Sequence, residues 1–270
     1  MKCEIISIGN ELLIGKIANT NAQWLTKRIT ALGGEVQRIT TISDNIEEIA
    51  SVIKTSVARG TNLIITSGGL GPTFDDRTLS GVSEAVGKPL QLNNKALEMV
   101  RKAYREAHEG GILKELELTS PRLKMAFLPK GSTPLLNTVG TAPGVLLNYR
   151  SVTIVSLPGV PSEMQAIFEL NLVPIVRKIA GKRYPYEYSL QVRGIVESEL
   201  APLIDEVMSK NSGVYIKSHP RREEAISKIE LHLYAVSSNK ILSKNRVKKA
   251  TREMSKLIVN NGGKLTSSGK

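Results

Sequence analysis

The segment ITSGGLGPTFDD, residues 65–76, carries the residues best suited to chemistry in this chain. Its glycines, Gly68, Gly69 and Gly71, tolerate positive φ angles and let backbone N–H groups come close to a ligand. Because a helix is expected directly after them, its N-terminus and these amides could converge on a phosphate group. The segment lacks the Lys-Ser/Thr pair of a Walker A loop and the GxGxxG spacing of a dinucleotide fingerprint. From the glycines alone, a phosphate site and an ordinary strand-to-helix turn fit equally well.

Two carboxylates, Asp75 and Asp76, follow these glycines. Negative side chains beside a phosphate would repel it unless a divalent cation bridged them to the phosphate oxygens. We therefore expect a metal-dependent site, which Asp44, in the segment TTISDN, could join. The alternative for Asp44 and Asp76 is that each caps the helix that follows it.

Three further segments combine glycine with polar residues: GNELLIG (9–15), NTVGTAPG (137–144) and LPGVPSE (157–163). Taken singly they also suit ordinary turns; in LPGVPSE, for example, Pro161 fits the first turn of a helix. Their placement favours a function, because the segments at 9–15, 65–76 and 157–163 and Asp44 all follow predicted parallel strands. Open α/β sheets bind ligands at that edge.

Short β-rich runs alternate with longer amphipathic segments, which predicts an α/β fold with a mostly parallel sheet covered by helices. The segment AGKRYP ends the last helix with glycine and proline, so we expect one domain at residues 1–180 and a smaller α+β domain at 184–264. We predict strands at 3–8, 35–41, 62–66, 125–128, 144–148 and 152–157, with helices at 21–32, 46–58, 76–86, 94–109 and 162–179. The second domain is predicted as β-α-β-β-α, at 188–195, 197–209, 214–218, 225–236 and 239–260.

Composition narrows the function further. The chain has 270 residues and 41% hydrophobic content, enough for a core, and no 18-residue apolar stretch, which argues against a membrane span. Its single cysteine, Cys3, suits a reducing cytoplasm.

The net charge of +12 divides into +5 (21 basic, 16 acidic) up to Lys182 and +7 (16 basic, 9 acidic) after it. Although this charge suits polyanions, 4% aromatic residues offer few surfaces for stacking bases, which argues against nucleic acid.

The sequence lacks the residues that a zinc site or a serine hydrolase would need. The three histidines are scattered, cysteine pairs for zinc are absent, and there is no GxSxG elbow of a serine hydrolase.

The segments IGNELLIGKIANTNAQWL, TTISDN, ITSGGLGPTFDD, NTVGTAPG and LPGVPSEM occur in the order found in the CinA family, which residues 1–180 resemble. The resemblance implies a three-layer α/β fold like that of MoaB and Mog, which bind molybdopterin. The C-terminal part resembles the KH-type domain of that family, but it has no GxxG loop for nucleic acid. The sequence ends before the nicotinamide-nucleotide amidase domain of bacterial relatives, so we expect no amidase activity.

The same resemblance implies a function and a ligand shell. CinA domains are associated with hydrolysis of a nucleotide pyrophosphate such as ADP-ribose, aided by a divalent cation (Mg, Mn or Co) and by K+; FAD is a related substrate. In the superfamily, the glycine loop and the following Asp bind the phosphate of molybdopterin or of an adenylated nucleotide. One departure concerns residues 119–126, TSPRLKMA, which keep Lys124 but lack the asparagine pair of bacterial relatives. The ligand shell that the resemblance implies is Gly68, Gly69, Gly71, Thr73, Asp75 and Asp76, with Asp44, Gly159 and Glu163 nearby. Together with the other loops that follow the strands, the candidate residues are Asp75, Asp76 and Lys124 for catalysis, Asp44, Asp75 and Asp76 for the metal, and Gly9, Asn10, Glu11, Gly68, Gly69, Gly71, Thr73, Gly140, Thr141, Gly159, Ser162 and Glu163 for the substrate or its phosphates.

Three functions remain open from the sequence. The first is a metal-assisted pyrophosphatase, in which the aspartates hold the cation, the glycine amides neutralise the phosphates and an activated water attacks. The second is a binding or transferase module for a pterin phosphate or adenylated pterin, without hydrolysis. The third is a basic protein that associates with nucleic acid in a salt-dependent manner. The partner in the first two is a small molecule, and self-association of the α/β domain is expected.

Overall fold

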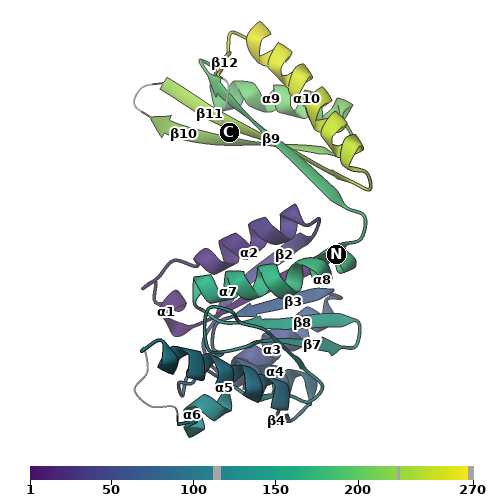
Figure 1. Ribbon diagram of the computed structural model, residues 1–270. Coiled ribbons are helices and arrows are strands. Elements are labelled where there is room, and N and C mark those ends of the chain that lie inside the picture. Colours follow the sequence, from purple (N-terminus) through teal and green to yellow (C-terminus); the bar gives the residue numbers. More distant parts are fainter. Residues whose placement is uncertain (112–116, 224–225, 267–270) are drawn as a thin grey trace. The chain divides into compact units, whose positions relative to one another are not determined.

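The computed structural model describes residues 1–111, 117–223 and 226–266. It divides the chain into two compact units (Figure 1). The first consists of Met1–Thr30 and Gly34–Ala180, and the second of Ala31–Gly33 and Gly181–Lys270. No helix in the described ranges is both long and apolar enough to cross a membrane.

The first unit is built around a six-stranded sheet in the order β2-β1-β3-β8-β7-β6. The first four strands run parallel and β7 runs antiparallel to both of its neighbours, so the predicted mostly parallel sheet is confirmed. The central strands β1 and β3 are buried on both faces, as their apolar sequences require. The strands are β1 (Lys2–Ile8), β2 (Glu35–Ile42), β3 (Leu63–Ser67), β6 (Thr133–Leu135), β7 (Gly144–Tyr149) and β8 (Val152–Leu157).

Helices cover both faces of this sheet, which confirms the predicted three layers (Figure 1). On one face α3 (Ile46–Ala58) and α4 (Thr78–Val86) pack on the sheet through residues such as Ile53 and Val82. On the other lie α2 (Thr20–Ala31) and a helical segment comprising α7 (Pro161–Ile167), a π-helical turn (Phe168–Leu172) and α8 (Val173–Ala180). Trp24 of α2 meets Phe168 edge to face, with ring centroids 5.3 Å apart.

The remaining elements of the first unit lie beside this framework. A two-stranded sheet joins β4 to β5, and a short helix follows β1 directly. Their bounds are α1 (Asn10–Leu13), β4 (Leu90–Leu92), α5 (Asn94–Glu109), α6 (Ser120–Lys124) and β5 (Phe127–Pro129).

The second unit is an antiparallel sheet, in the order β10-β11-β9-β12, with two helices packed on one face. Its core joins the sheet to both helices through residues such as Leu231, Leu200 and Met254. The predicted β-α-β-β-α order is present, and β12 adds a strand after the last predicted helix; residue 225, the first of one predicted strand, lies outside the described residues. The elements are β9 (Tyr184–Arg193), α9 (Glu197–Lys210), β10 (Val214–Glu223), β11 (Ile226–Ser237), α10 (Lys240–Asn260) and β12 (Lys264–Thr266).

Candidate functional site

The carboxyl ends of the four parallel strands meet at one edge of the sheet, where the segments that follow them line a pocket of about 380 Å3. A fifth segment reaches the same pocket from the connection between β6 and β7. The sequence-based expectation that these loops gather at one edge therefore holds. The lining residues are Ile8, Gly9, Glu11, Asp44, Gly68, Gly69, Leu70, Gly71, Pro72, Thr73, Asp75, Asp76, Thr141, Ala142, Pro158, Gly159, Val160 and Glu163.

The turn after β3 requires glycine at two positions. Gly68 (φ 113°) and Gly69 (φ 66°) adopt backbone conformations that side chains disfavour. A Cβ atom at Gly68 would also collide with the carbonyl oxygen of Ile8. The hydroxyl of Thr78 donates to the Gly68 carbonyl at 2.7 Å, which ties the turn to the first residue of α4. The turn is thus packed between β1 and α4, with its backbone facing the pocket.

Thr73 holds the two carboxylates of this segment. Its N–H donates to Asp76 Oδ2 at 2.8 Å, and its hydroxyl lies 2.6 Å from the same oxygen and also bonds to Asp75. The hydrogen bond from Thr73 is the main cause that lowers the pKa of Asp75. The alternative that Asp76 caps α4 is not what the structure shows, because α4 begins at Thr78 and Arg77 precedes it without a side-chain cap.

Asp44 also does not cap the helix that follows it. Asn45 caps α3 by accepting from the N–H of Glu48 at 2.8 Å, which leaves Asp44 Oδ2 to accept from the N–H of Asn10 at 3.1 Å. Burial raises the pKa of Asp44, and repulsion from Glu11, Asp75 and Asp76 adds to this, whereas the Asn10 hydrogen bond opposes it. Glu11, Asp44, Asp75 and Asp76 thus bring carboxylates from three segments to one pocket.

Lys124 contacts the segment that follows the glycine turn. Its Nζ donates to the carbonyl of Thr73 at 2.5 Å, and it lines a smaller adjoining hollow with Gly69, Gly71 and Asp76. Burial lowers the pKa of Lys124, while the nearby aspartates oppose this. Lys124 is therefore close to the turn and to its carboxylates, although it does not line the main pocket.

The NTVGTAPG loop is fixed to α7 by Asn137. Its side chain accepts from the N–H of Gly140 at 3.0 Å and donates to Glu163 Oε2 at 2.6 Å. A Cβ atom at Gly140 would collide with the Glu163 carboxylate. Glu163 thus anchors this loop rather than capping α7, which has no side-chain cap. Thr141, held in place by these contacts, lines the pocket.

Most of the candidate site residues line the pocket, and three others besides Lys124 lie outside its lining. Asn10 contributes its backbone N–H to Asp44, and Gly140 lies behind the lining against Glu163. Ser162 is exposed in the first turn of α7 and does not line the pocket.

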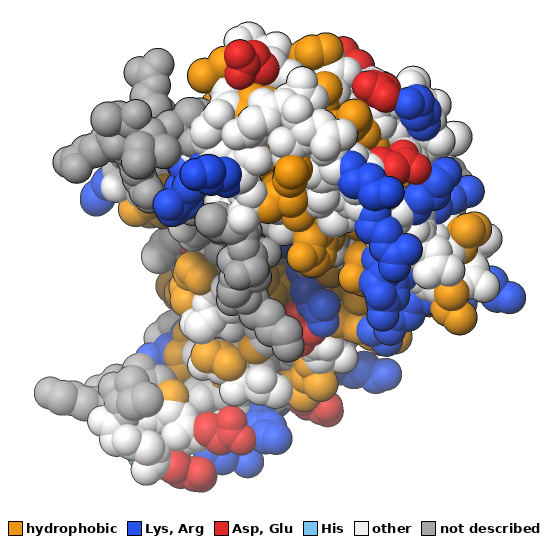
Figure 2. Space-filling view, turned by 90° about the horizontal axis from the view of Figure 1, so that it is seen from above, with side chains coloured by type: hydrophobic (Ala, Val, Ile, Leu, Met, Phe, Trp, Pro, Cys, Tyr) orange, Lys and Arg blue, Asp and Glu red, His pale blue; other side chains and the backbone are white. Residues whose placement is uncertain are grey.

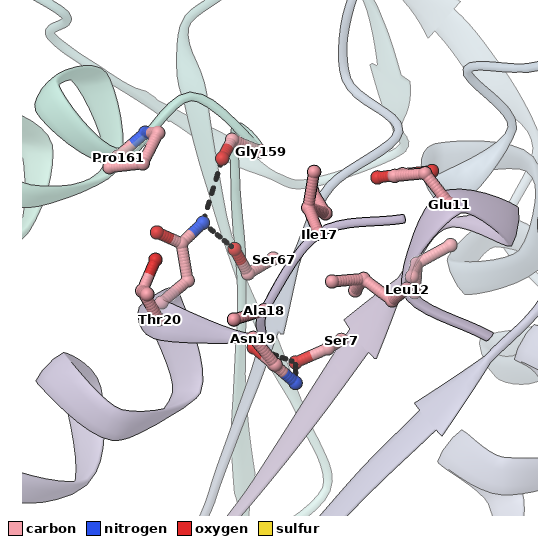
Figure 3. Close-up of a pocket in the computed structure, with 12 residues that line it drawn as sticks. Ser7, Glu11, Leu12, Ile17, Ala18, Asn19, Thr20, Ser67, Gly159 and Pro161 are labelled. Carbon is pink, nitrogen blue, oxygen red and sulfur yellow. Dashed lines mark hydrogen bonds between the residues drawn. The ribbon is translucent and has the colours of Figure 1, made fainter. Parts of the chain in front are cut away.

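A second hollow, of about 80 Å3, adjoins the pocket and holds polar residues that the sequence analysis missed (Figure 3). Asn21 Nδ2 donates to the hydroxyl of Ser67 at 3.0 Å and to the carbonyl of Gly159 at 2.7 Å. Asn19 caps α2 by accepting from the N–H of Ala22 at 3.1 Å, and its Nδ2 donates to Ser7 at 2.9 Å. The only signal for these roles was the NTN segment before the helix, because the partners are far away in sequence.

The donor atoms around the pocket suit a hard divalent cation, which prefers carboxylate oxygens. Within the described ranges, no three His, Cys, Asp or Glu side chains converge as a complete metal-ligand group. Magnesium, however, commonly binds through one or two carboxylates and completes its shell with water and ligand phosphates. The carboxylates of Asp75, Asp76 and Asp44 fit that mode of binding.

Comparison with known proteins finds similarity along most of the chain. Residues 4–178 match the family model described as a probable molybdopterin binding domain. The crystal structure of the protein CinA with unknown function, from Thermoplasma acidophilum, is 36% identical, with a TM-score of 0.57, and covers 63% of this chain and 96% of that one. A protein of Aeropyrum pernix is 48% identical over 220 residues, which are 82% of this chain and 79% of the relative. One from Caldivirga maquilingensis is 43% identical over 257 residues, 94% and 95% of the two chains.

Proposed function

The chain belongs to the CinA family and carries its probable molybdopterin-binding domain, and on that basis we propose that the pocket hydrolyses a nucleotide pyrophosphate such as ADP-ribose or FAD. The observation that carries the proposal is the meeting, in one pocket, of a glycine turn with Asp44, Asp75 and Asp76. A pyrophosphate needs both features, since backbone amides bind its oxygens and carboxylates hold the cation that balances its charge.

The residues have separate tasks in this proposal. The amides of the turn at Gly69 to Gly71 bind and orient the phosphates, since the Gly68 N–H donates to the Leu157 carbonyl, and Thr73 keeps Asp75 and Asp76 in position for a divalent cation. When bound, such a cation neutralises phosphate charge and increases the acidity of water. Water then forms a bond to one phosphorus atom and loses a proton to solvent, the bond from that atom to the bridging oxygen breaks, and two phosphate monoesters leave.

The test is release of AMP from ADP-ribose by the purified chain, measured with and without Mg, Mn or Co and with or without K+. The control is the double variant Asp75→Ala, Asp76→Ala, whose thermal unfolding is measured beside it. Cation-dependent release that the variant loses, while it remains folded, supports the pyrophosphatase.

The family description favours one other function, in which the pocket holds a pterin phosphate or an adenylated pterin without hydrolysing it. Saturable binding of such a ligand that depends on the glycine turn, with no AMP released under any cation condition, would replace the first proposal by this one.

A further inference from the structure

The second unit carries a groove of its own, of about 250 Å3, between the first half of β9 and α10. Tyr186 and Tyr188 form its strand side; they lie two residues apart and therefore face the same side of the sheet. The helix side is formed by Val247, Lys248, Thr251 and Arg252. We name this feature the tyrosine groove.

The helix side of the tyrosine groove is positively charged. Lys244, Lys248 and Arg252 follow one another at four-residue intervals, which places them on one ridge of α10. Among the described residues, no carboxylate pairs with Lys248 or Arg252, whereas Lys249, on another side of the helix, lies 3.8 Å from a carboxylate oxygen of Glu253. Figure 2 shows Lys and Arg side chains gathered in a band beside hydrophobic ones on the face drawn.

The strand side presents a row of aromatic rings. Tyr184, Tyr186 and Tyr188 are three of the seven tyrosines of the chain, and they alternate along β9. Tyr184 is 42% and Tyr188 43% exposed, whereas Tyr186 is partly buried and packs against the core of this unit. In the described part of the chain, β12 pairs only with residues 191–193 of β9, so no strand covers the tyrosines from that side.

The basic side chains of α10 and the tyrosine rings of β9 are spaced at similar intervals. The hydroxyl of Ser243 near the start of α10 donates to the carbonyl of Tyr184 at 2.5 Å, and β12, which follows α10, pairs with Gln191 to Arg193 at the end of β9, so α10 runs alongside β9 in the same direction. Four residues of helix advance by about 6 Å and two residues of strand by about 6.6 Å. The three basic residues of α10 and the three tyrosines of β9 therefore have nearly the same spacing. Such spacing suits a ligand that repeats one ring and one negative charge.

We propose that the tyrosine groove binds a short stretch of single-stranded nucleic acid, with bases stacked on Tyr186 and Tyr188 and phosphates at Lys244, Lys248 and Arg252. Stacking on aromatic rings combined with a basic wall along the backbone is how single strands are bound without sequence preference. The net charge of +7 after Lys182 adds general attraction. The low aromatic content argued against nucleic acid, but the folded chain concentrates its tyrosines on one strand. This site lies on the second unit, and its proposed role does not depend on the function proposed for the pocket of the first unit.

The test uses fluorescence anisotropy of the full chain with a labelled ten-nucleotide single strand of mixed sequence, over a series of salt concentrations. The variant Lys248→Gln, Arg252→Gln is compared with Lys249→Gln, Lys256→Gln, which removes the same charge from the same helix. Tyr188→Ala is compared with Tyr215→Ala, which removes another exposed tyrosine. Thermal unfolding confirms that each variant is folded.

We expect the first charge variant to weaken binding by about tenfold or more and to lower the salt slope by roughly 1.4, since each phosphate contact on a single strand contributes about 0.7. Tyr188→Ala should weaken binding by about tenfold, as loss of one stacked base does. Both controls should retain affinity within about threefold. Equal losses in the control pair, equally tight binding of a duplex or of an acidic peptide, or no binding at low salt would each overturn the proposal.

Discussion

Thr73 is the residue on which both aspartates of the glycine turn depend, because its hydroxyl and its N–H bond to them. In Thr73→Val the N–H remains but the hydroxyl is lost, so both carboxylates gain freedom at the place where the cation is proposed to bind. We expect AMP release to fall by about tenfold, equivalent to the loss of one net hydrogen bond to a charged group. The cation concentration for half-maximal rate should rise.

The matched control is Thr73→Ser, which keeps the hydroxyl and should keep the rate within about threefold. Initial rates over a titration of magnesium distinguish the two variants. If Thr73→Val matched the unsubstituted chain in both rate and cation requirement, the hydroxyl would have no part in positioning the aspartates.

Asn21 is a second residue whose substitution should affect both stability and nucleotide affinity. Its Nδ2 ties the turn after β8 to β3, and its Oδ1 is buried without a partner in the described residues. Asn21→Ala removes one partly buried and one exposed hydrogen bond, each worth about 0.5–1.5 kcal/mol, so the free energy of unfolding should fall by about 1–3 kcal/mol. Because Gly159 lines the pocket, nucleotide affinity should fall as well.

Asn21→Asp tests whether donation is what matters. It keeps the shape but places a second oxygen against the Gly159 carbonyl, so it should be at least as damaging as Asn21→Ala. Gln23→Ala, at an exposed position of the same helix, should be neutral in both denaturant unfolding and nucleotide titration. A stable Asn21→Asp variant with full affinity would contradict this account of the turn.

At the scale of elements, the junction between β3 and α4 depends on close backbone packing. In Gly68→Ala, the positive φ and the collision with the Ile8 carbonyl both act on backbone that cannot easily move. We expect the free energy of unfolding to fall by more than about 1 kcal/mol, measured by urea denaturation. Gly159→Ala is the comparison, because its Cβ would meet Gly68 Cα at 3.5 Å, an ordinary contact. A change within about 0.5 kcal/mol is expected there, and equal losses in both variants would contradict the argument.

Elements with strong apolar patterns could be predicted from the sequence, and those shaped by distant contacts could not. The runs at β1, β3 and β8 fix their strands, and hence the edge at which the pocket forms. The helix expected at 76–86 instead begins at Thr78, because Asp76 turns back to Thr73. The π-helical turn in the segment expected at 162–179 has no local signature either.

The same division applies to the site. Glycine and aspartate indicate phosphate and cation binding by their residue type alone, so the loops that line the main pocket could be predicted from the sequence. The bond from Asn21 to Gly159, by contrast, spans 138 residues, and nothing near either residue in sequence indicates it. Only the packing of α2 beside the turn after β8 brings these two groups together.

At the scale of the molecule, the first unit is held by a buried polar cluster remote from the pocket. Glu4, 2% exposed on β1, accepts hydrogen bonds from Ser56 at 2.9 Å, from Thr61 at 2.7 Å and from Arg59 Nε at 2.9 Å. Burial alone would raise the pKa of Glu4, but the hydrogen bonds from Arg59, Thr61 and Ser56 outweigh it and lower the pKa to about 2. The cluster joins β1, the end of α3 and the approach to β3.

This cluster predicts how stability depends on pH. Because the pKa of Glu4 falls from 4.5 to about 2 on folding, its contribution is complete above pH 4.5 and is lost as the pH falls toward 2. The contribution is on the order of 3 kcal/mol. Urea midpoints measured between pH 7 and pH 2.5 should therefore decline below pH 4.5. Glu4→Gln should be less stable than the unsubstituted chain at pH 7, since Arg59 loses its buried partner, and should decline less steeply in acid. Parallel declines of both proteins would assign the acid sensitivity to other carboxylates.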